Sequence, residues 1–313
     1  NRSRRCGVLK IVVSEKISDS GMAVFKAAGF QADEKPGCTT EELKRILPEY
    51  QAWVVRSGTR CTAELIEAAV QLKVIGRAGV GLDNVDLQVA ARRNIRVVNT
   101  PDANTVSAAE HTFAMMLAMA RQIPQARLSL QEGKWERNRF LGVELCGKTL
   151  GIVGFGRIGT NVALKALAFG MKVVAFDPFI DPALMTDRGV ETLPFAELIK
   201  RSDFITVHAP LTDETHGMFG IKEMECMRNG VRIVNCARGG IFDEEALYQA
   251  LRNGKIAAAA LDVFETEPPH QHPLLTLENV VAVPHLGAAT QEAREKVGIQ
   301  VAEQVVKALR EFR

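Results

Sequence analysis

Short apolar runs alternate with amphipathic helical patterns along the chain. In the first hundred residues, this pattern predicts strands at 8–13, 53–55, 74–76 and 95–98, and helices near 19–28, 62–70 and 86–93. Strands that alternate with helices in this way are typical of a parallel sheet covered by helices on both faces.

A second alternating series begins at residue 149. It predicts strands at 149–153, 172–176, 204–207, 231–235, 256–261 and 280–283. Before it, Asn104 is a candidate N-cap for a long helix that reaches residue 121. A last amphipathic helix is predicted at 290–313, and we expect it to return to the first domain. The fold class is therefore α/β with two doubly wound parallel-sheet domains, a flavodoxin-like discontinuous substrate domain (1–103 and 287–313) and a Rossmann domain (104–286).

A glycine-rich turn joins the strand predicted at 149–153 to the next helix. Gly154 permits a tight turn, Gly156 lets a pyrophosphate approach the backbone, and Gly159 packs helix on strand. The turn also contains Arg157 and Ile158, and the pyrophosphate would sit at the helix N-terminus. Asp177, followed by Pro178, ends the next strand, where its carboxylate would bind both ribose hydroxyls and repel a 2′-phosphate. NAD is therefore favoured over NADP, although Asp177 alone also fits an ordinary turn.

Three further strand ends carry groups suited to acid–base chemistry. Arg238, before a Gly-Gly turn, can present its guanidinium to a carboxylate or a developing oxyanion. Glu267 can orient His285, which would then act as a base toward a hydroxyl proton. Each residue alone could be a surface ion pair, a solvated carboxylate or a strand-end histidine. Their joint occurrence beside a dinucleotide fingerprint favours a catalytic site.

Bulk properties narrow the classes of function. A chain of 313 residues favours two domains, and a net charge of +2 gives no reason to expect a nucleic-acid or membrane partner. The strongly apolar helical stretch at 112–120 is too short to span a bilayer. Six cysteines without metal-ligand spacing predict reduced thiols of a cytoplasmic protein, with neither disulfides nor a metal site. Residues 1–5 are interpreted as a trimmed or disordered terminus.

The motifs GFGRIG, NCARGG, LDVFETEPP and PHLGAAT resemble, in order, those of the D-isomer-specific 2-hydroxyacid dehydrogenases. Segments 55–57, 76–86 and 133–137 resemble the branch that oxidises 3-phosphoglycerate. The resemblance implies that Arg238 binds and polarises the substrate, that His285 donates or accepts the proton, and that Glu267 pairs with it. It also implies that Asp262 contacts the nicotinamide carboxamide. Further residues that the resemblance places at the cofactor are Ala209, Pro210, Cys236, Ala237, Gly287 and Ala288.

Two positions depart from the family pattern, because Ala209 and Val80 lack the hydroxyl that relatives can carry there. Members of the branch often have an added C-terminal regulatory region, and this sequence stops at Arg313. Serine feedback through such a region is therefore not expected.

A phosphorylated hydroxy acid has two anionic ends, so a second cationic group must meet the phosphate. Candidates for substrate binding are Arg56, Arg77, Gly79, Asn104, Arg137 and Arg139. Arg137 and Arg139 lie in an arm, residues 133–140, which in the family can reach a neighbouring subunit; the alternative is that these arginines are solvated surface charge. With the small residues of the helix at 104–121, this arm predicts a homodimer formed through the NAD-binding domain.

The leading hypothesis is NAD-linked oxidation of 3-phosphoglycerate to 3-phosphohydroxypyruvate, the first step of serine biosynthesis. A glyoxylate/hydroxypyruvate reductase or D-lactate enzyme remains an alternative, in which the arginines of the arm have no phosphate to bind. A NAD-sensing corepressor of the C-terminal-binding protein type would need an extended partner-binding tail. An aldehyde dehydrogenase with Cys236 as nucleophile is less favoured, because His285 and Glu267 offer a better acid–base pair.

Overall fold

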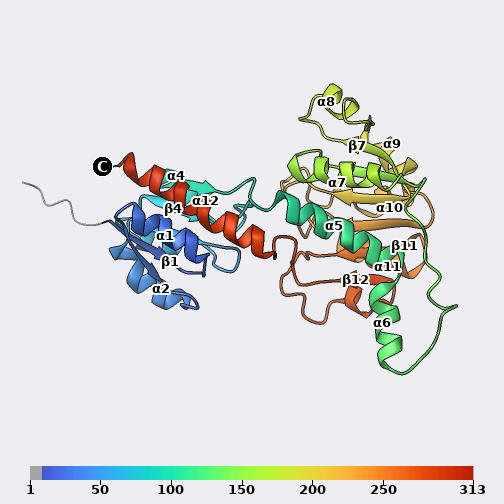
Figure 1. Ribbon diagram of the computed structural model, residues 1–313, viewed down its shortest axis with the longest axis horizontal. Coiled ribbons are helices and arrows are strands. Elements are labelled where there is room, and N and C mark those ends of the chain that lie inside the picture. Colours follow the sequence, from blue (N-terminus) through green and yellow to red (C-terminus); the bar gives the residue numbers. More distant parts are fainter. Residues whose placement is uncertain (1–8, 313) are drawn as a thin grey trace, which may run out of the picture. The chain divides into compact units, whose positions relative to one another are not determined.

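The computed structural model describes residues 9–312 and divides the chain into two compact units. Unit 1 comprises residues 1–104 and 288–313, and unit 2 comprises residues 105–287. Figure 1 shows the elements of both. The expectation for residues 1–5 concerns positions outside the described residues.

Unit 1 contains a five-stranded parallel sheet in the order β2-β1-β3-β4-β5. Its strands are β1 (Lys10–Val13), β2 (Gln31–Glu34), β3 (Ala52–Val55), β4 (Val74–Arg77) and β5 (Arg96–Asn99). Successive side chains of a strand point to opposite faces, so Ile11 and Val13 enter one core cluster while Val12 enters another. Both faces of the sheet are therefore buried, which is why the central strands read as continuous apolar runs.

The helices of unit 1 cover these two faces. They are α1 (Asp19–Ala27), α2 (Thr40–Ile46), α3 (Ala63–Ala68), α4 (Leu87–Arg92) and α12 (Gln291–Arg310), with a 3₁₀ turn at Leu47–Glu49. The C-terminal helix α12 packs along α1 and across β4 (Figure 1). A Cβ atom on Gly21 would lie 2.5 Å from the carbonyl oxygen of Gly298, so glycines at this crossing allow the two backbones to touch.

Unit 2 contains a seven-stranded parallel sheet in the order β12-β11-β10-β9-β6-β7-β8. Its strands are β6 (Thr149–Val153), β7 (Lys172–Phe176), β8 (Glu191–Thr192), β9 (Phe204–Val207), β10 (Val231–Asn235), β11 (Ile256–Leu261) and β12 (Val280–Ala282). The strand order reverses beside β6, which lies between β7 and β9. In open α/β sheets, ligands bind beyond the carboxyl ends of the strands at such a reversal.

Helices also cover both faces of the second sheet. They are α5 (Thr105–Ala120), α6 (Ile123–Gln131), α7 (Arg157–Ala168), α8 (Pro182–Thr186), α9 (Phe195–Arg201), α10 (Ile221–Cys226) and α11 (Glu244–Arg252), with a 3₁₀ turn at Pro273–Thr276. Helices α5 and α7 pack side by side (Figure 1), and α5 also contacts β11. This places α5 next to the strands that carry the acid–base candidates.

The predicted fold class is confirmed, because both units are parallel α/β layers. Strands β2 and β8 were missed, since each lies at a sheet edge and is polar, and neither shows an apolar run. The N-cap prediction for Asn104 was wrong: its buried side-chain oxygen has no hydrogen-bond partner among the described residues. Within residues 9–312, no helix combines the length and apolarity that crossing a bilayer requires.

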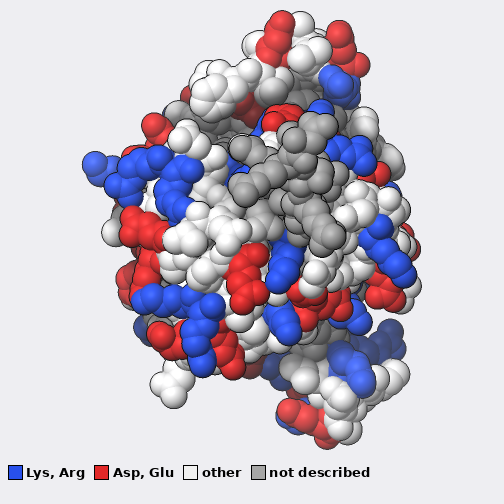
Figure 2. Space-filling model, turned by 90° about the vertical axis from the view of Figure 1, so that its left-hand side faces the viewer, with Lys and Arg blue, Asp and Glu red and all other residues white. Residues whose placement is uncertain are grey.

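Acidic and basic side chains are interspersed on the face drawn in Figure 2. Neither sign of charge forms a continuous field over the part of that face that the structure describes.

Candidate active site

The glycine-rich turn after β6 has the geometry that a dinucleotide requires. Gly154 has a φ of +91°, and a Cβ atom there would lie 2.6 Å from the carbonyl oxygen of His208. A Cβ atom on Gly159 would lie 2.1 Å from the carbonyl oxygen of Gly154, so helix and turn are in backbone contact. Gly156 caps α7, and nothing lies within 4 Å of its hypothetical Cβ. Open space at the N-terminus of a twelve-residue helix fits a pyrophosphate.

Asp177 is fixed at the end of β7, beside this turn. One carboxylate oxygen accepts a hydrogen bond from the Phe155 amide at 2.8 Å, and the other accepts one from the Phe179 amide at 2.9 Å. Each oxygen keeps a second lone pair. The side chain is therefore held in place and can still accept hydrogen bonds from a ribose.

Two more cofactor candidates follow β9. The His208 amide donates to the Val153 carbonyl at 2.7 Å, which ties this strand end to β6. Ala209 packs against the core of unit 2, and the carbonyl of Pro210 accepts a hydrogen bond from the Thr215 hydroxyl at 2.6 Å. The segment at 208–210 is therefore held in place at the carboxyl edge of the sheet, beside Gly154.

The turn after β10 presents Arg238 from a backbone that its own side chains stabilise. The Asn235 carboxamide accepts from the Ala237 amide at 3.1 Å and donates to the Arg238 carbonyl at 2.9 Å. A Cβ atom on Gly239 would lie 2.0 Å from the backbone of Phe264, so only glycine lets this turn pack against the loop after β11. The loop that packs there carries Glu267, which brings Arg238 and Glu267 to adjacent loops.

His285 and Glu267 form a hydrogen-bonded pair, with Nδ1 and Oε2 2.8 Å apart. This hydrogen bond raises the pKa of His285 against the opposing effect of burial, and the negative charges of Glu267 and Asp262 raise it further. Burial favours the protonated form of Glu267, but the hydrogen bond and charge of His285 outweigh it, so the pKa of Glu267 is lowered. Both side chains remain partly exposed. The pair is an imidazole with a fixed carboxylate partner and access to solvent.

Asp262, at the end of β11, holds the backbone beside His285. Its carboxylate accepts hydrogen bonds from the amides of Leu286 at 2.6 Å and Gly287 at 2.8 Å, and its carbonyl accepts from the His285 amide at 2.9 Å. Asp262 is 1% exposed as a whole residue. His285 has a φ of +53°, a conformation that these contacts maintain.

Cys236 directly follows β10, and its sulfur lies close to Asp262. Burial raises the pKa of its thiol to about 12, and the charge of Asp262 acts in the same direction. The thiol therefore stays protonated near neutral pH, which argues against the aldehyde dehydrogenase alternative.

In unit 1, Arg56 directly follows β3, and Arg77 is the last residue of the neighbouring strand β4. The Arg56 amide donates to Glu15 at 2.9 Å, and the Arg56 carbonyl accepts from Asn84 at 2.6 Å. A Cβ atom on Gly79 would collide with the Arg77 guanidinium at 1.5 Å, so glycine makes room for this group. Both arginines thus lie at the carboxyl edge of the first sheet.

Arg137 and Arg139 lie in the exposed arm that follows α6. Arg139 forms ion pairs with Glu136 at 3.2 Å and with Glu278 at 2.9 Å. The guanidinium of Arg139 is thus engaged by carboxylates of its own chain, which sequence reasoning did not foresee.

Two contacts beside these residues were missed in the sequence. His111 of α5 lies with Nε2 3.3 Å from Asp262 Oδ1. His272 lies 2.9 Å from Glu244, whose other oxygen accepts from the Glu265 amide at 2.7 Å and so supports the loop that carries Glu267. The only sequence signal for His111 is a polar residue within an apolar helix, and nothing there identifies its partner.

Comparison with known proteins gives a family match. Residues 113–287 match the model "D-isomer specific 2-hydroxyacid dehydrogenase, NAD binding domain". The chain is similar to the D-3-phosphoglycerate dehydrogenase of Archaeoglobus fulgidus, with 51% identity over 299 residues, 95% of this chain and 57% of that protein. The chain thus spans a little over half the length of this curated relative.

Solved structures share the fold over nearly the full chain. The TT0316 protein from Thermus thermophilus superposes with a TM-score of 0.88 and 35% identity, covering 97% of both chains. D-lactate dehydrogenase from Aquifex aeolicus, solved in complex with NAD and lactic acid, has a TM-score of 0.82 and 29% identity, covering 97% of this chain and 95% of its own.

Proposed function

The chain belongs to the D-isomer specific 2-hydroxyacid dehydrogenase family, and we propose that it oxidises 3-phosphoglycerate to 3-phosphohydroxypyruvate, the first step of serine biosynthesis. Its cofactor is NAD, because the matched domain is an NAD-binding domain. The observation that carries the reaction type is the 2.8 Å pair of His285 and Glu267, one loop from Arg238. The choice of substrate is supported by the A. fulgidus relative and by the arginines of unit 1.

The acid–base step follows from which imidazole nitrogen is engaged. With Nδ1–H donating to the Glu267 carboxylate, Nε2 is the nitrogen that can accept a proton. In oxidation, His285 Nε2 takes the proton of the C2 hydroxyl, and Glu267 stabilises the imidazolium that forms. Bound NAD would supply the acceptor for the hydride of C2. Arg238 binds the substrate carboxylate and stabilises charge that develops on the C2 oxygen.

We assign cofactor binding to the turn at 154–159 and to Asp177. The nicotinamide end is assigned to the segments that contain Ala209, Cys236 and Asp262, which follow β9, β10 and β11. The 104–286 segment is then the NAD-binding domain, and 1–103 with 287–313 is the substrate domain. A phosphorylated substrate needs a second cationic site, for which Arg56 and Arg77, beside Gly79, are the candidates of unit 1.

We further propose a cytoplasmic homodimer. Apolar side chains are exposed on α6 and in the segment that follows it, namely Ile123, Leu128, Leu130, Trp135 and Leu141. Large apolar groups gathered on a surface are typical of an interface. The small residues Ser107, Ala108 and Ala109 do not serve it, because they are buried where α5 packs within unit 2.

Steady-state kinetics with NAD test the proposal. The expected result is a kcat/KM for 3-phosphoglycerate well above that for D-lactate or D-glycerate. The reverse order would make the chain a dehydrogenase of phosphate-free 2-hydroxy acids. The His285→Ala variant, which lacks the proposed proton acceptor, should lose most of this activity.

A further inference from the structure

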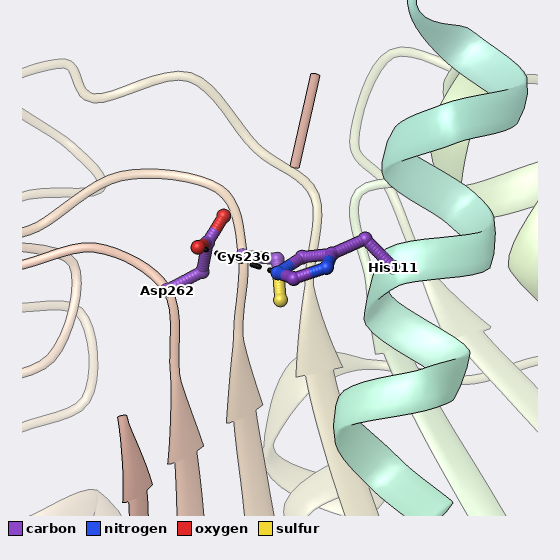
Figure 3. A group of neighbouring side chains, drawn as sticks. All are labelled: His111, Cys236 and Asp262. Atoms are coloured by element: carbon purple, nitrogen blue, oxygen red, sulfur yellow. Dashed lines mark ion pairs between the residues drawn. The ribbon is translucent and has the colours of Figure 1, made fainter. Parts of the chain in front are cut away.

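Three side chains from separate elements of unit 2 converge at the carboxyl edge of its sheet. His111 projects from α5, Cys236 follows β10, and Asp262 follows β11 (Figure 3). One donor atom of each, nitrogen, sulfur and oxygen, lies within 4.8 Å of the other two. We propose that this triad binds one zinc ion, and that bound zinc and bound NAD exclude each other.

The donor set selects a borderline soft cation. Imidazole nitrogen, thiolate sulfur and carboxylate oxygen are the three donor types that zinc uses, whereas Mg²⁺ and Ca²⁺ take oxygen ligands. With bonds of about 2.0–2.3 Å in a tetrahedral shell, ligand atoms stand roughly 3.3–3.8 Å apart. His111 Nε2 and Asp262 Oδ1 already lie 3.3 Å apart. Small side-chain movements would bring the sulfur to the same spacing.

The triad is prearranged and its polar atoms are incompletely satisfied. Two backbone amides fix the Asp262 carboxylate, and each of its oxygens keeps a second lone pair. His111 Nε2 is buried and makes no hydrogen bond within the described residues, although it faces this carboxylate. Buried polar groups are normally satisfied, so an ion between these atoms would supply what the protein does not. Three protein ligands also leave the fourth zinc position open.

The cysteine spacing indicated no metal site, because the ligands lie on elements far apart in the sequence. A site of this kind is built by topology: the neighbouring strands β10 and β11 end side by side, and α5 packs against both. Cys236 binds as the thiolate, so one proton leaves the thiol for each zinc ion bound.

The position of the triad predicts antagonism with the cofactor. The strand ends that carry Cys236 and Asp262 are where the proposed function places the nicotinamide, and this part of the inference rests on that assignment. If the two ligands share the site, each must weaken the other by the same factor. Zinc would then act as an inhibitor competitive with NAD.

Direct metal titration tests the site without substrate. Co²⁺, added to protein reduced with a phosphine, is expected to produce a thiolate-to-cobalt charge-transfer absorption that saturates at one ion per chain and is abolished by Zn²⁺. The Cys236→Ser variant should lose this absorption, while the matched control Cys226→Ser, which alters an exposed cysteine on α10, should keep it. His111→Gln should weaken Co²⁺ binding, because it removes one of the three proposed ligands.

An absorption that persists in Cys236→Ser, or that never develops in the parent protein, would overturn the site. Thermal unfolding of each variant shows whether a lost cobalt absorption comes from misfolding. If Cys236→Ser does not fold, the Co²⁺ affinity of His111→Gln tests the site independently. Saturating NAD should suppress the cobalt signal. A cobalt signal unchanged at saturating NAD would overturn the exclusion. These measurements use no hydroxy acid, so the substrate assay can fail while the metal result stands, and the reverse.

Discussion

At the carboxyl edge of each sheet, a carboxylate that follows one strand accepts hydrogen bonds from backbone amides of the loop after the neighbouring strand. The two loops carry different functional groups. In unit 1, the Glu15 carboxylate, after β1, accepts hydrogen bonds from the amides of Arg56, Gly58 and Thr59, after the neighbouring β3. In unit 2, the Asp262 carboxylate, after β11, accepts hydrogen bonds from the amides of Leu286 and Gly287, after the neighbouring β12. The loop held in unit 1 carries an arginine, and the loop held in unit 2 carries His285.

The difference lies in what surrounds the held loop. Asp262 is almost fully buried, while Glu15 is half-buried. Charge-assisted hydrogen bonds are stronger where water is excluded, so the hydrogen bonds of Asp262 hold their loop more firmly than those of Glu15. His285 also has a carboxylate partner, Glu267, on the adjacent loop. In both units, the carboxyl edge of a parallel sheet provides the carboxylate that holds the loop. Proton transfer needs a second carboxylate beside the residue that the loop carries. Among the contacts compared, only His285 of unit 2 has one, Glu267.

The largest expected effect is the loss of the groups proposed to act on the substrate. His285→Ala and Arg238→Ala should each lower kcat roughly a hundredfold or more, because one removes the proton acceptor and the other a charge-stabilising donor. Stopped-flow and steady-state assays measure this. NAD affinity, followed by protein fluorescence, should hardly change in His285→Ala. Near-normal turnover in either variant would refute the mechanism.

Substituting the two gripping carboxylates tests the comparison directly. Asp262→Asn replaces one acceptor oxygen by an NH₂ group that faces a backbone amide, and hydrogen bonds to charged groups contribute about 1.5–3 kcal/mol. We expect kcat to fall roughly tenfold to a hundredfold through the displaced His285. Glu15→Gln should instead raise KM for 3-phosphoglycerate and leave kcat nearly unchanged. A loss of NAD affinity in Asp262→Asn that accounts for its whole loss of kcat would show that Asp262 acts through its proposed nicotinamide contact and not through His285.

A smaller effect on rate, with a diagnostic pH shift, is expected for Glu267→Gln. Glu267 raises the pKa of His285, and oxidation needs the neutral imidazole, so activity is lost as the pH falls through that pKa. Without the carboxylate the pKa returns toward its ordinary value, and this acid limb moves to lower pH. In the reductive direction, which needs the imidazolium, the basic limb moves to lower pH as well. pH profiles of kcat/KM that superpose with those of the parent would exclude the pairing.

The cofactor end of unit 2 gives a comparable test. Asp177→Ala removes the proposed ribose acceptor, so Kd for NAD should rise by about tenfold while Kd for NADP changes less. Isothermal titration with both nucleotides measures the ratio. Asp187→Ala, at an exposed position after α8, is the matched control. A parent protein that already prefers NADP would contradict the role of Asp177.

The sequence revealed features that depend on local chemistry. The glycine turn at 154–159 and the strand ends that carry Arg238, Glu267 and His285 could be found because turns need glycine and buried strands need apolar runs. Contacts between distant elements could not be found in this way. Neither the grip of Asp262 on the backbone at 286–287 nor the approach of His111 leaves a pattern in the chain. The polar edge strand β2 was missed for the related reason that it buries little.

The smallest expected effect concerns the arm at 133–140, whose arginines are candidates for binding the substrate phosphate in a partner subunit. Arg139 is paired with Glu136 and Glu278, so it can reach a partner subunit's substrate only by giving up these exposed ion pairs, which contribute little to stability. Replacing Arg137 and Arg139 by alanine should then raise KM for 3-phosphoglycerate a few-fold and leave KM for D-lactate unchanged. Arg188→Ala, at an exposed position of unit 2 outside the arm, measures the effect of losing one surface arginine elsewhere. Equal effects on both substrates, or full activity from a monomer in light scattering at assay concentration, would assign the phosphate to Arg56 and Arg77 alone.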